Sequence, residues 1–158
     1  MELSLDDEIL ISRLKPISLD VFEVDLPRAE VNQMVTRLFM SSIYGGSMQA
    51  AFPNIGAKKL AEHGMDDFMY LHLKYHPYAP QRPGGNGLWF SPEWFGEPWQ
   101  GVHRVFTRDY DLSMWQYMGQ YEVKTTESLT RAEWLELGSV VFVLYPVWLR
   151  IYLQFLFR

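Results

Sequence analysis

Apolar residues along the first half of the chain form short runs that stop at proline or glycine. Val, Phe and Leu dominate the stretch between Pro16 and Pro27, a composition typical of strands. Farther along, apolar residues recur at helix-like spacing until Gly45-Gly46, a strong helix terminator. The elements predicted here are a strand over residues 17–27, a helix over 30–44 and a second, short helix within residues 54–64. Asn54 is the candidate cap of this second helix, and Gly64 lies just past its end.

The second half alternates strand-like runs with turns rich in Pro, Gly and Asn. The "QRPGGNG" run predicts a turn, because these residues supply the backbone angles that turns need. The last two strand-like runs are separated by "DLS", which predicts a tight antiparallel connection. The strands predicted in this half cover residues 66–76, 87–91, 102–110 and 114–124, with a loop over 92–101.

A well-specified helix start precedes an unusual tail. Thr130 and Glu133 match the capping box, in which the hydroxyl of Thr130 and the carboxylate of Glu133 each accept from the other residue's amide. The short helix is expected to end by Gly138. Residues 140–157 are then almost wholly apolar and approach the ~20 residues that a membrane span needs. This tail is a membrane span, a buried or interface-seeking element, or a segment that does not belong to the domain.

Composition narrows the classes of function. Aromatic residues make up 16% of the chain, which favours β-rich structure and stacking pockets. A net charge of −5 argues against an extended nucleic-acid surface, but it leaves room for a narrow pocket that reads one base. Cysteine is absent, so disulfides, zinc ribbons and thiol catalysis are excluded. The acidic N-terminal stretch lacks the pattern of a secretory signal, so we expect an intracellular protein, nuclear or cytoplasmic, with membrane association through residues 140–157 as the lesser alternative.

The stretch "MWQYMGQYEVK" carries the first candidate site. On a regular strand, Trp115, Tyr117, Gly119 and Tyr121 share one face, because side chains alternate with period two. One interpretation is a core face on which Gly119 marks a bulge or a close backbone approach. The other is that Gly119 leaves room for a ligand between Trp115 and Tyr121.

Three loop tryptophans and two arginines extend the candidate site. Trp89, Trp94 and Trp99 recur every five residues, which fits neither a strand nor a helix. They pin a Pro/Gly loop to the sheet or form a platform for a flat ligand. Arg104 and Arg108 share one side of a strand, where they clamp an anion or pair with acidic residues nearby.

The histidine spacing indicates no metal site, and known catalytic motifs are absent from the sequence. His72 and His76 would lie about 13 Å apart on an extended strand, too far to share one ion. We find no nucleophile elbow, phosphate loop, dinucleotide fingerprint or zinc-protease motif. No cofactor or metal is therefore expected, and the balance leans away from an enzyme.

Five stretches occur in an order that resembles one family. They are "DVFEVDLP", "FMSSIYGGSMQAAFPNI", "HGMDDFMYLHLKYHPYAPQRPGGNGLWFS", "HRVFTRD" and "WQYMGQYEVKTTESLTRAEW". The chain is similar over residues 17–137 to an uncharacterised domain of mushroom-forming fungi, catalogued as a domain of unknown function. That resemblance implies no established activity. The order of the "GLWFS", "RVFTR" and "WQYMGQYEV" runs also resembles, more weakly, PUA-like and SRA-like barrels, which implies a pocket for a flipped, modified base.

Together these observations predict one α+β domain at residues 17–137, after an irregular lead-in at 1–16 and before an apolar segment at 138–158. Its strongly bent antiparallel sheet, or PUA/SRA-like partial barrel, carries two or three short helices. We expect a non-enzymatic module that holds a small planar or anionic ligand, such as a single modified base, in an aromatic and arginine pocket. The alternative is a protein-interaction scaffold whose apolar tail meets a membrane or a partner. The predicted ligand-binding residues are Trp89, Trp94, Trp99, Arg104, Arg108, Trp115, Tyr117 and Tyr121.

Overall fold

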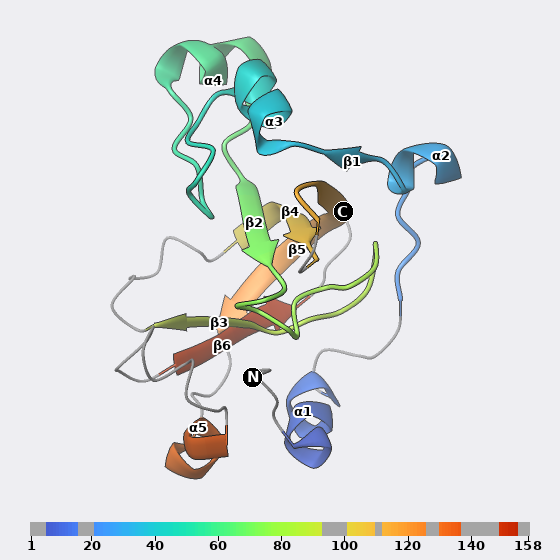
Figure 1. Ribbon diagram of the computed structural model, residues 1–158, viewed down its shortest axis with the longest axis vertical. Coiled ribbons are helices and arrows are strands. Elements are labelled where there is room, and N and C mark those ends of the chain that lie inside the picture. The colour runs from blue at the N-terminus through green and yellow to red at the C-terminus, as the bar shows by residue number, and fades with distance from the viewer. Residues whose placement is uncertain are drawn as a thin grey trace.

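The computed structural model describes residues 6–15, 21–92, 101–109, 112–125, 130–136 and 149–154. Helices lie at both ends of a curled sheet, with α3 and α4 at one end and α1 and α5 at the other (Figure 1). The α+β class is thereby confirmed. In chain order the elements are α1 (Asp7–Leu14), α2 (Arg28–Val31), β1 (Met34–Val35), α3 (Arg37–Tyr44), α4 (Ala57–His63), β2 (Phe68–His72), β3 (Trp89–Pro92), β4 (Gly101–Arg108), β5 (Trp115–Thr125), α5 (Arg131–Glu136) and β6 (Leu149–Gln154).

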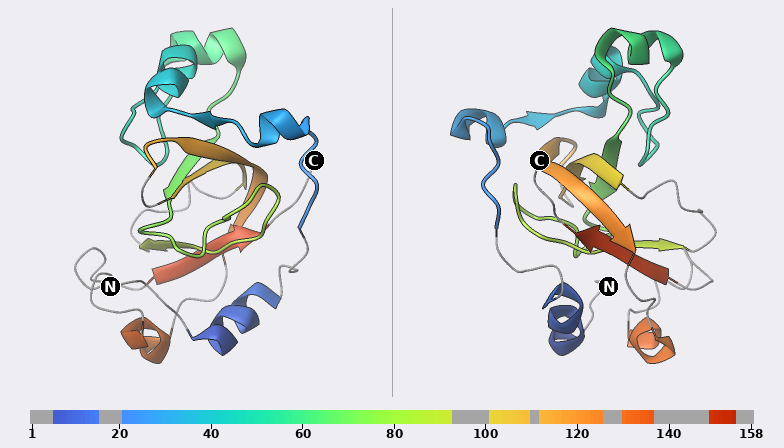
Figure 2. Two further views of the ribbon diagram at one scale, coloured as in Figure 1. Left: turned by 45° about the vertical axis from the view of Figure 1, so that its right-hand side comes forward. Right: turned by 180° about the vertical axis from the view of Figure 1, so that it is seen from behind.

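The described strands form one mixed sheet in the order β2-β4-β5-β6-β3, with β1 paired to β5. Neighbouring strands run antiparallel except β2 and β4, which run parallel. The expectation of a wholly antiparallel sheet is therefore wrong at this edge. A long connection that contains β3 joins β2 to β4, and only a crossover of this kind can make neighbouring strands parallel. The curl of the sheet agrees with the predicted strong bend (Figure 2).

One extra residue in β5 interrupts the predicted β4–β5 hairpin, which is otherwise confirmed. Phe106 pairs with Tyr117 and Val105 pairs with Gly119, so Met118 is inserted between the two pairs as a β-bulge. The insertion changes the face on which later residues of β5 point. The single aromatic face predicted for β5 is therefore wrong, because period-two alternation does not continue through a bulge.

Two hydrophobic clusters lie on opposite faces of this sheet. The α3-side cluster lies under α3 and includes Trp115, and the loop-side cluster lies under residues 78–88 and includes Tyr121. Buried members of the α3-side cluster are Met40, Ile55, Phe68, Tyr70, Phe106 and Trp115. Buried members of the loop-side cluster are Met69, Leu71, Ala79, Trp89, Val105, Met118, Tyr121 and Val123.

Pairing with β5 breaks the long helix predicted over residues 30–44. Met34 and Val35 form β1 against β5, so the chain is extended between α2 and α3. Thr36 keeps extended angles, and its hydroxyl accepts from the Phe39 amide at 3.1 Å, which starts α3 as a new helix. The predicted stop is confirmed, since Gly45 follows the helix at φ +85°.

The second predicted helix is confirmed as α4, although its start is shifted. It is preceded by Gly56 rather than Asn54, and it ends at Gly64 in the left-handed conformation. The predicted strand over residues 17–27 is wrong in its described part, residues 21–27, which has no regular structure.

The apolar tail contributes a strand to the sheet. Residues 149–154 form β6, which pairs with β5 on one side and with β3 on the other. A boundary at residue 137 therefore separates β6 from the sheet to which it belongs. Within the described residues, no helix is long and apolar enough to cross a membrane.

The loop over residues 78–88 lies so close to neighbouring backbone that two of its glycines are required. A Cβ on Gly84 would lie 1.8 Å from the Phe22 carbonyl oxygen, at a φ of +74° that favours glycine. A Cβ on Gly87 would lie 2.6 Å from Pro80 Cδ. Backbone bonds complete the loop, from Phe22 N to Gly84 O at 3.0 Å and from Gly84 N to Met118 O at 2.9 Å.

Replacing Gly84 with alanine should destabilise the fold far more than the same change at Gly64. Both glycines have positive φ, so each substitution incurs about 1–2 kcal/mol of backbone strain. Nothing lies within 4 Å of a Cβ on Gly64, so Gly64→Ala is the matched control. We expect Gly84→Ala to lower the free energy of unfolding by at least about 2 kcal/mol more, measured by urea denaturation. Equal losses for the two variants would contradict this close packing.

Candidate functional site

The predicted site residues do not gather in one place. Trp89 and Tyr121 belong to the loop-side cluster, whereas Trp115 and Tyr117 pack on the α3 side. Arg104 and Arg108 lie on the α3 side as well, in register with β2 residues of that face. Trp94 and Trp99 lie outside the described residues. The sheet itself therefore separates the members of the predicted pocket.

Tyr121 is a core residue and not one wall of a ligand slot beside Gly119. It is fully buried, and its hydroxyl donates to the Gly85 carbonyl at 3.1 Å. Burial raises the pKa of the Tyr121 hydroxyl, which stays protonated as a donor. Its ring lies 3.4 Å from the point where a Cβ of Gly119 would stand, and Gly119 has a φ of +129°. The positive φ thus favours glycine at the bulge, and the Tyr121 ring is at ordinary contact distance, as the core interpretation of this strand holds.

An arginine and an indole dominate the α3 side. The Arg37 guanidinium carbon lies 3.5 Å from the Tyr70 ring centroid and 5.7 Å from that of Trp115. The same guanidinium donates to the Ser47 carbonyl and, at 3.0 Å, to the Ala50 carbonyl. Burial lowers the pKa of Arg37 and raises that of Tyr70 to about 12. Trp115 is 8% exposed, so this group braces the sheet and offers no open platform for a flat ligand.

The two strand arginines differ in their surroundings. Arg104 forms an ion pair with Asp67, which confirms the pairing interpretation with a partner other than those nearest in sequence. The Arg108 guanidinium carbon lies 5.2 Å from the Trp115 ring centroid. Its Nε is buried and has no hydrogen-bond partner among the described residues.

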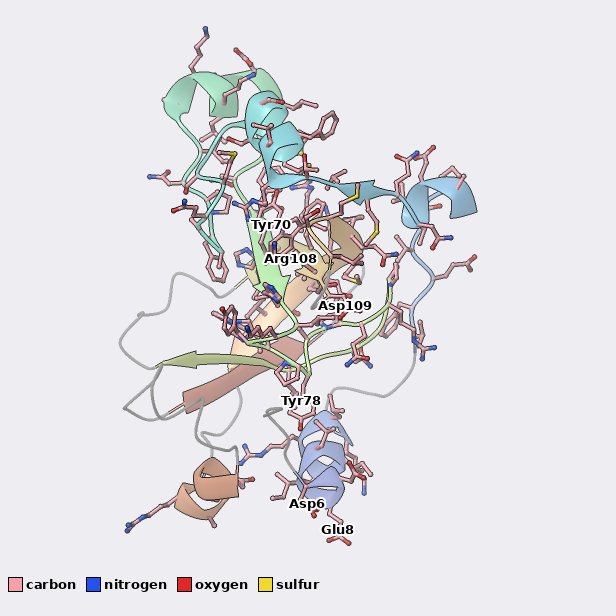
Figure 3. The ribbon with its side chains drawn as sticks, in the orientation of Figure 1. Asp6, Glu8, Tyr70, Tyr78, Arg108 and Asp109 are labelled. Atoms are coloured by element: carbon pink, nitrogen blue, oxygen red, sulfur yellow. The ribbon has the colours of Figure 1, made fainter. Side chains whose placement is uncertain are left out.

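A cavity of about 490 Å³ lies between α1 and the loop over residues 78–88. None of the predicted ligand-binding residues that the structure describes lines it. Tyr78, at the start of this loop, lies toward α1 (Figure 3). The cavity is lined by Leu10, Leu14, Val21, Tyr78, Ala79, Gln81, Arg82, Gly85 and Asn86.

One wall of the cavity is rigid and polar. Besides the contacts of Gly84 and Gly87, the Leu88 amide donates to the Tyr78 carbonyl at 2.7 Å, which closes the loop at its base. The Arg82 side chain lies over Gly85, with Nε 3.8 Å from the point where a Cβ would stand. This wall therefore presents a phenol, two amides and one exposed guanidinium from a fixed backbone.

The other wall is apolar and is held from a distance. Leu10 and Leu14 are one helical turn apart on α1, so both face the loop. The helix is attached to α5 by a two-pronged ion pair, in which Arg13 Nη2 donates to both Glu133 carboxylate oxygens at 2.8 and 2.7 Å. Both side chains are only 13% exposed.

The capping box fixes the acidic partner of this ion pair. Glu133 Oε2 accepts from the Thr130 amide at 2.5 Å, and the Glu133 amide donates to the Thr130 hydroxyl at 3.3 Å, as the sequence predicts. Burial by itself would raise the pKa of Glu133. The hydrogen bonds from Arg13 and Thr130 outweigh burial, and the pKa is lowered.

Comparison with known proteins identifies the family of this chain. Residues 34–142 match the family described as "Domain of unknown function (DUF6697)". The chain belongs to the DUF6697 family. The matched range runs from β1 through α5 and contains the polar wall of the cavity and Glu133, but not α1. No curated protein and no solved structure gives a significant match.

Metal-binding groups are not brought together in the part of this DUF6697 chain that the structure describes, where no cluster of three or more His, Asp or Glu side chains could hold an ion. β2 ends at His72, and the chain then turns, so His76 N donates to the His72 carbonyl at 3.0 Å. The strand predicted to reach residue 76 is therefore too long. Burial, with a smaller contribution from His72, lowers the pKa of His76 to about 3, as expected for a neutral core histidine.

Sequence reasoning missed the cavity because each of its signals is weak by itself. Leu10 and Leu14 have the spacing of a helix face, but the lead-in they occupy is short and acidic. Arg82 lies in the Pro/Gly run over residues 81–87, which predicts only a turn, and Tyr78 lies just before this run, between Pro77 and Pro80. A loop held by a rigid scaffold is a common place for binding residues, and this was the one usable signal.

Removing the negative charge of Glu133 should weaken the attachment of α1 to α5. A carboxylate with a lowered pKa contributes stability above its unfolded value, here 4.5, and the contribution is lost as the pH falls through the folded value. Glu133→Gln keeps a capping residue but loses the charge. We therefore expect the free energy of local opening over residues 7–14 to fall by about 1–3 kcal/mol at pH 7, measured as faster amide exchange. Wild type should approach this behaviour in acid. Glu62→Gln removes an exposed pair with Lys59 and is the control. Unchanged exchange in Glu133→Gln would show that α1 is held by other contacts.

Proposed function

We propose that this DUF6697 domain is a non-enzymatic binding module for a small ligand that combines a planar or apolar part with an anionic group. The cavity between α1 and the 78–88 loop is the observation that carries the proposal. Its volume of about 490 Å³ falls within the roughly 300–1,000 Å³ usual for ligand sites. Ligand sites of this size also combine apolar walls with a few converging polar groups, as this one does.

The apolar part of the ligand would pack between α1 and the loop. Leu10 and Leu14 are only half-buried, and Val21 is exposed, so a ligand here would remove apolar surface from water. The Tyr78 ring lines the same space and can stack on a flat ligand. Nucleotides with ordinary or methylated bases fall within this ligand class, as do aromatic carboxylates.

The anionic part would pair with Arg82. This exposed guanidinium forms no ion pair with any described carboxylate, and its stem is positioned over Gly85 by the turn in which the Gly85 amide donates to the Arg82 carbonyl at 2.9 Å. Asn86 and Gln81 supply further hydrogen-bonding groups from the same loop. A positioned guanidinium and neighbouring amides suit a carboxylate or a phosphate.

A ligand of this class should raise the melting temperature of the full chain in a saturable way. We would screen nucleoside monophosphates, their methylated-base forms and aromatic carboxylates, each beside its uncharged counterpart. Arg82→Gln should weaken binding of the anionic member by about 10- to 100-fold, because a charge-assisted contact is lost. Lys58→Gln makes the same charge change on α4, at the opposite end of the molecule, and should leave the affinity unchanged.

Two outcomes would contradict the proposal. One is equal affinity in the Arg82→Gln and wild-type chains, which would place the ligand elsewhere. The other is the absence of any thermal shift across the whole panel from a domain that unfolds cooperatively.

An interaction scaffold is the second candidate, and the outer face of α3 favours it. Leu38, Phe39 and Ile43 are 67%, 51% and 42% exposed on this helix. Its inner face, which carries Arg37 and the buried Met40, already packs on the sheet. Silence from the ligand panel would make this apolar face the next surface to test.

A further inference from the structure

Arg108 ends β4 at the edge where β2 and β4 run parallel. It stands in register with His72, the last residue of β2, and both point to the α3 side of the sheet. Trp115 lies beneath it, with the Arg108 guanidinium carbon 5.2 Å from the ring centroid. The end of the parallel pair thus carries a positive charge over an indole ring.

The Arg108 guanidinium forms no ion pair with a described carboxylate. Described ion pairs engage Arg13, Lys59 and Arg104, but not Arg108. The Arg108 Nε is buried and has no hydrogen-bond partner among the described residues. A partly buried charge that is left unpaired destabilises a fold, so such groups are normally neutralised by a partner.

The neighbouring arginine, Arg37, already uses part of its guanidinium for contacts within the protein. Arg37 also lies by Trp115, but its guanidinium is used by the carbonyls of Ser47 and Ala50 and stacks on Tyr70. Its positive charge nevertheless remains close and adds to the local potential. Both guanidinium groups would therefore attract an anion, and Arg108 is the one whose Nε has no hydrogen-bond partner among the described residues.

We propose that Arg108 is an oxyanion-binding site, distinct from the α1 cavity, that takes the phosphate or carboxylate group of a ligand. The Nη groups of Arg108 would donate to the oxyanion, with Trp115 fixing the plane of the guanidinium. The site does not depend on the proposed function, because none of its residues lines the cavity.

His72 gives the site a built-in reporter. Its Nδ1 accepts from the Lys74 amide at 3.1 Å, which places the proton of the neutral ring on Nε2. Burial lowers the pKa of His72, Arg108 and Lys74 lower it further, and Asp109 raises it. An anion held by Arg108 would oppose the repulsion and raise this pKa. The ionisable groups near His72 are Arg108 and Asp109 from β4 and its end, and Lys74, Tyr75 and His76 from the turn after β2.

The test is a titration of the full chain with inorganic phosphate, and separately with acetate, at constant ionic strength. NMR would follow the Arg108 Nε–H and the His72 ring across pH. We expect a saturable shift of the Arg108 resonance and an upward shift of the His72 pKa with at least one anion. The anion that saturates at lower concentration identifies the phosphate or the carboxylate source. No saturable change with either anion would overturn the site.

Two variants separate binding from general charge effects. Arg108→Gln should weaken anion binding by about 10- to 100-fold and abolish the shift of His72. Arg131→Gln makes the same charge change on α5, at the end of the molecule away from α3, and should leave both unchanged. An unaltered response in Arg108→Gln overturns the proposal. Asp109→Asn removes the nearest acidic competitor and serves if Arg108→Gln fails to fold. It should tighten anion binding, and unchanged or weaker binding would overturn the site.

Discussion

The bulge at Met118 is the constraint on which the rest of the structure depends. Because one residue is inserted between two paired positions, a single strand supplies Trp115 to one cluster and Tyr121 to the other. Each face of the sheet thereby receives a large aromatic anchor, and each anchor holds a different irregular segment. Trp115 and Tyr70 retain Arg37 and the chain that follows α3, while the Tyr121 hydroxyl holds Gly85 in the cavity wall. A bulge is a small change in the backbone, yet here it decides which residues of β5 pack in each of the two clusters.

The cavity joins two kinds of structural element. Its polar wall is a loop fixed by backbone contacts, lies within the range matched to the family, and cannot move without disturbing the core beneath it. Its apolar wall is a single helix outside that range, attached mainly through Arg13 and Glu133. The polar wall is therefore part of the family range, whereas the apolar wall lies in the segment before it.

Local signals in the sequence predicted local structure well. The Gly45 stop, the Gly64 cap and the reciprocal bonds of Thr130 and Glu133 follow from short-range chemistry, and the structure contains all three. The features that the sequence did not predict depend on long-range pairing. Strand β1 breaks a helix pattern because β5 is available to it, and the bulge that divides the aromatic residues is visible only once β4 is paired. The cavity was missed for the same reason, since its two walls are brought together by contacts between distant parts of the chain.

The ion pair between Arg13 and Glu133 joins residues 120 positions apart. A contact of that separation forms late, because the intervening chain must first be ordered. During synthesis, the helix of Arg13 leaves the ribosome long before its acidic partner, so the ion pair that attaches α1 cannot form until α5 has been made. The cavity is therefore completed at a late stage of folding. A nascent chain could form its sheet edge at β2 and β4 before the ion pair attaches α1.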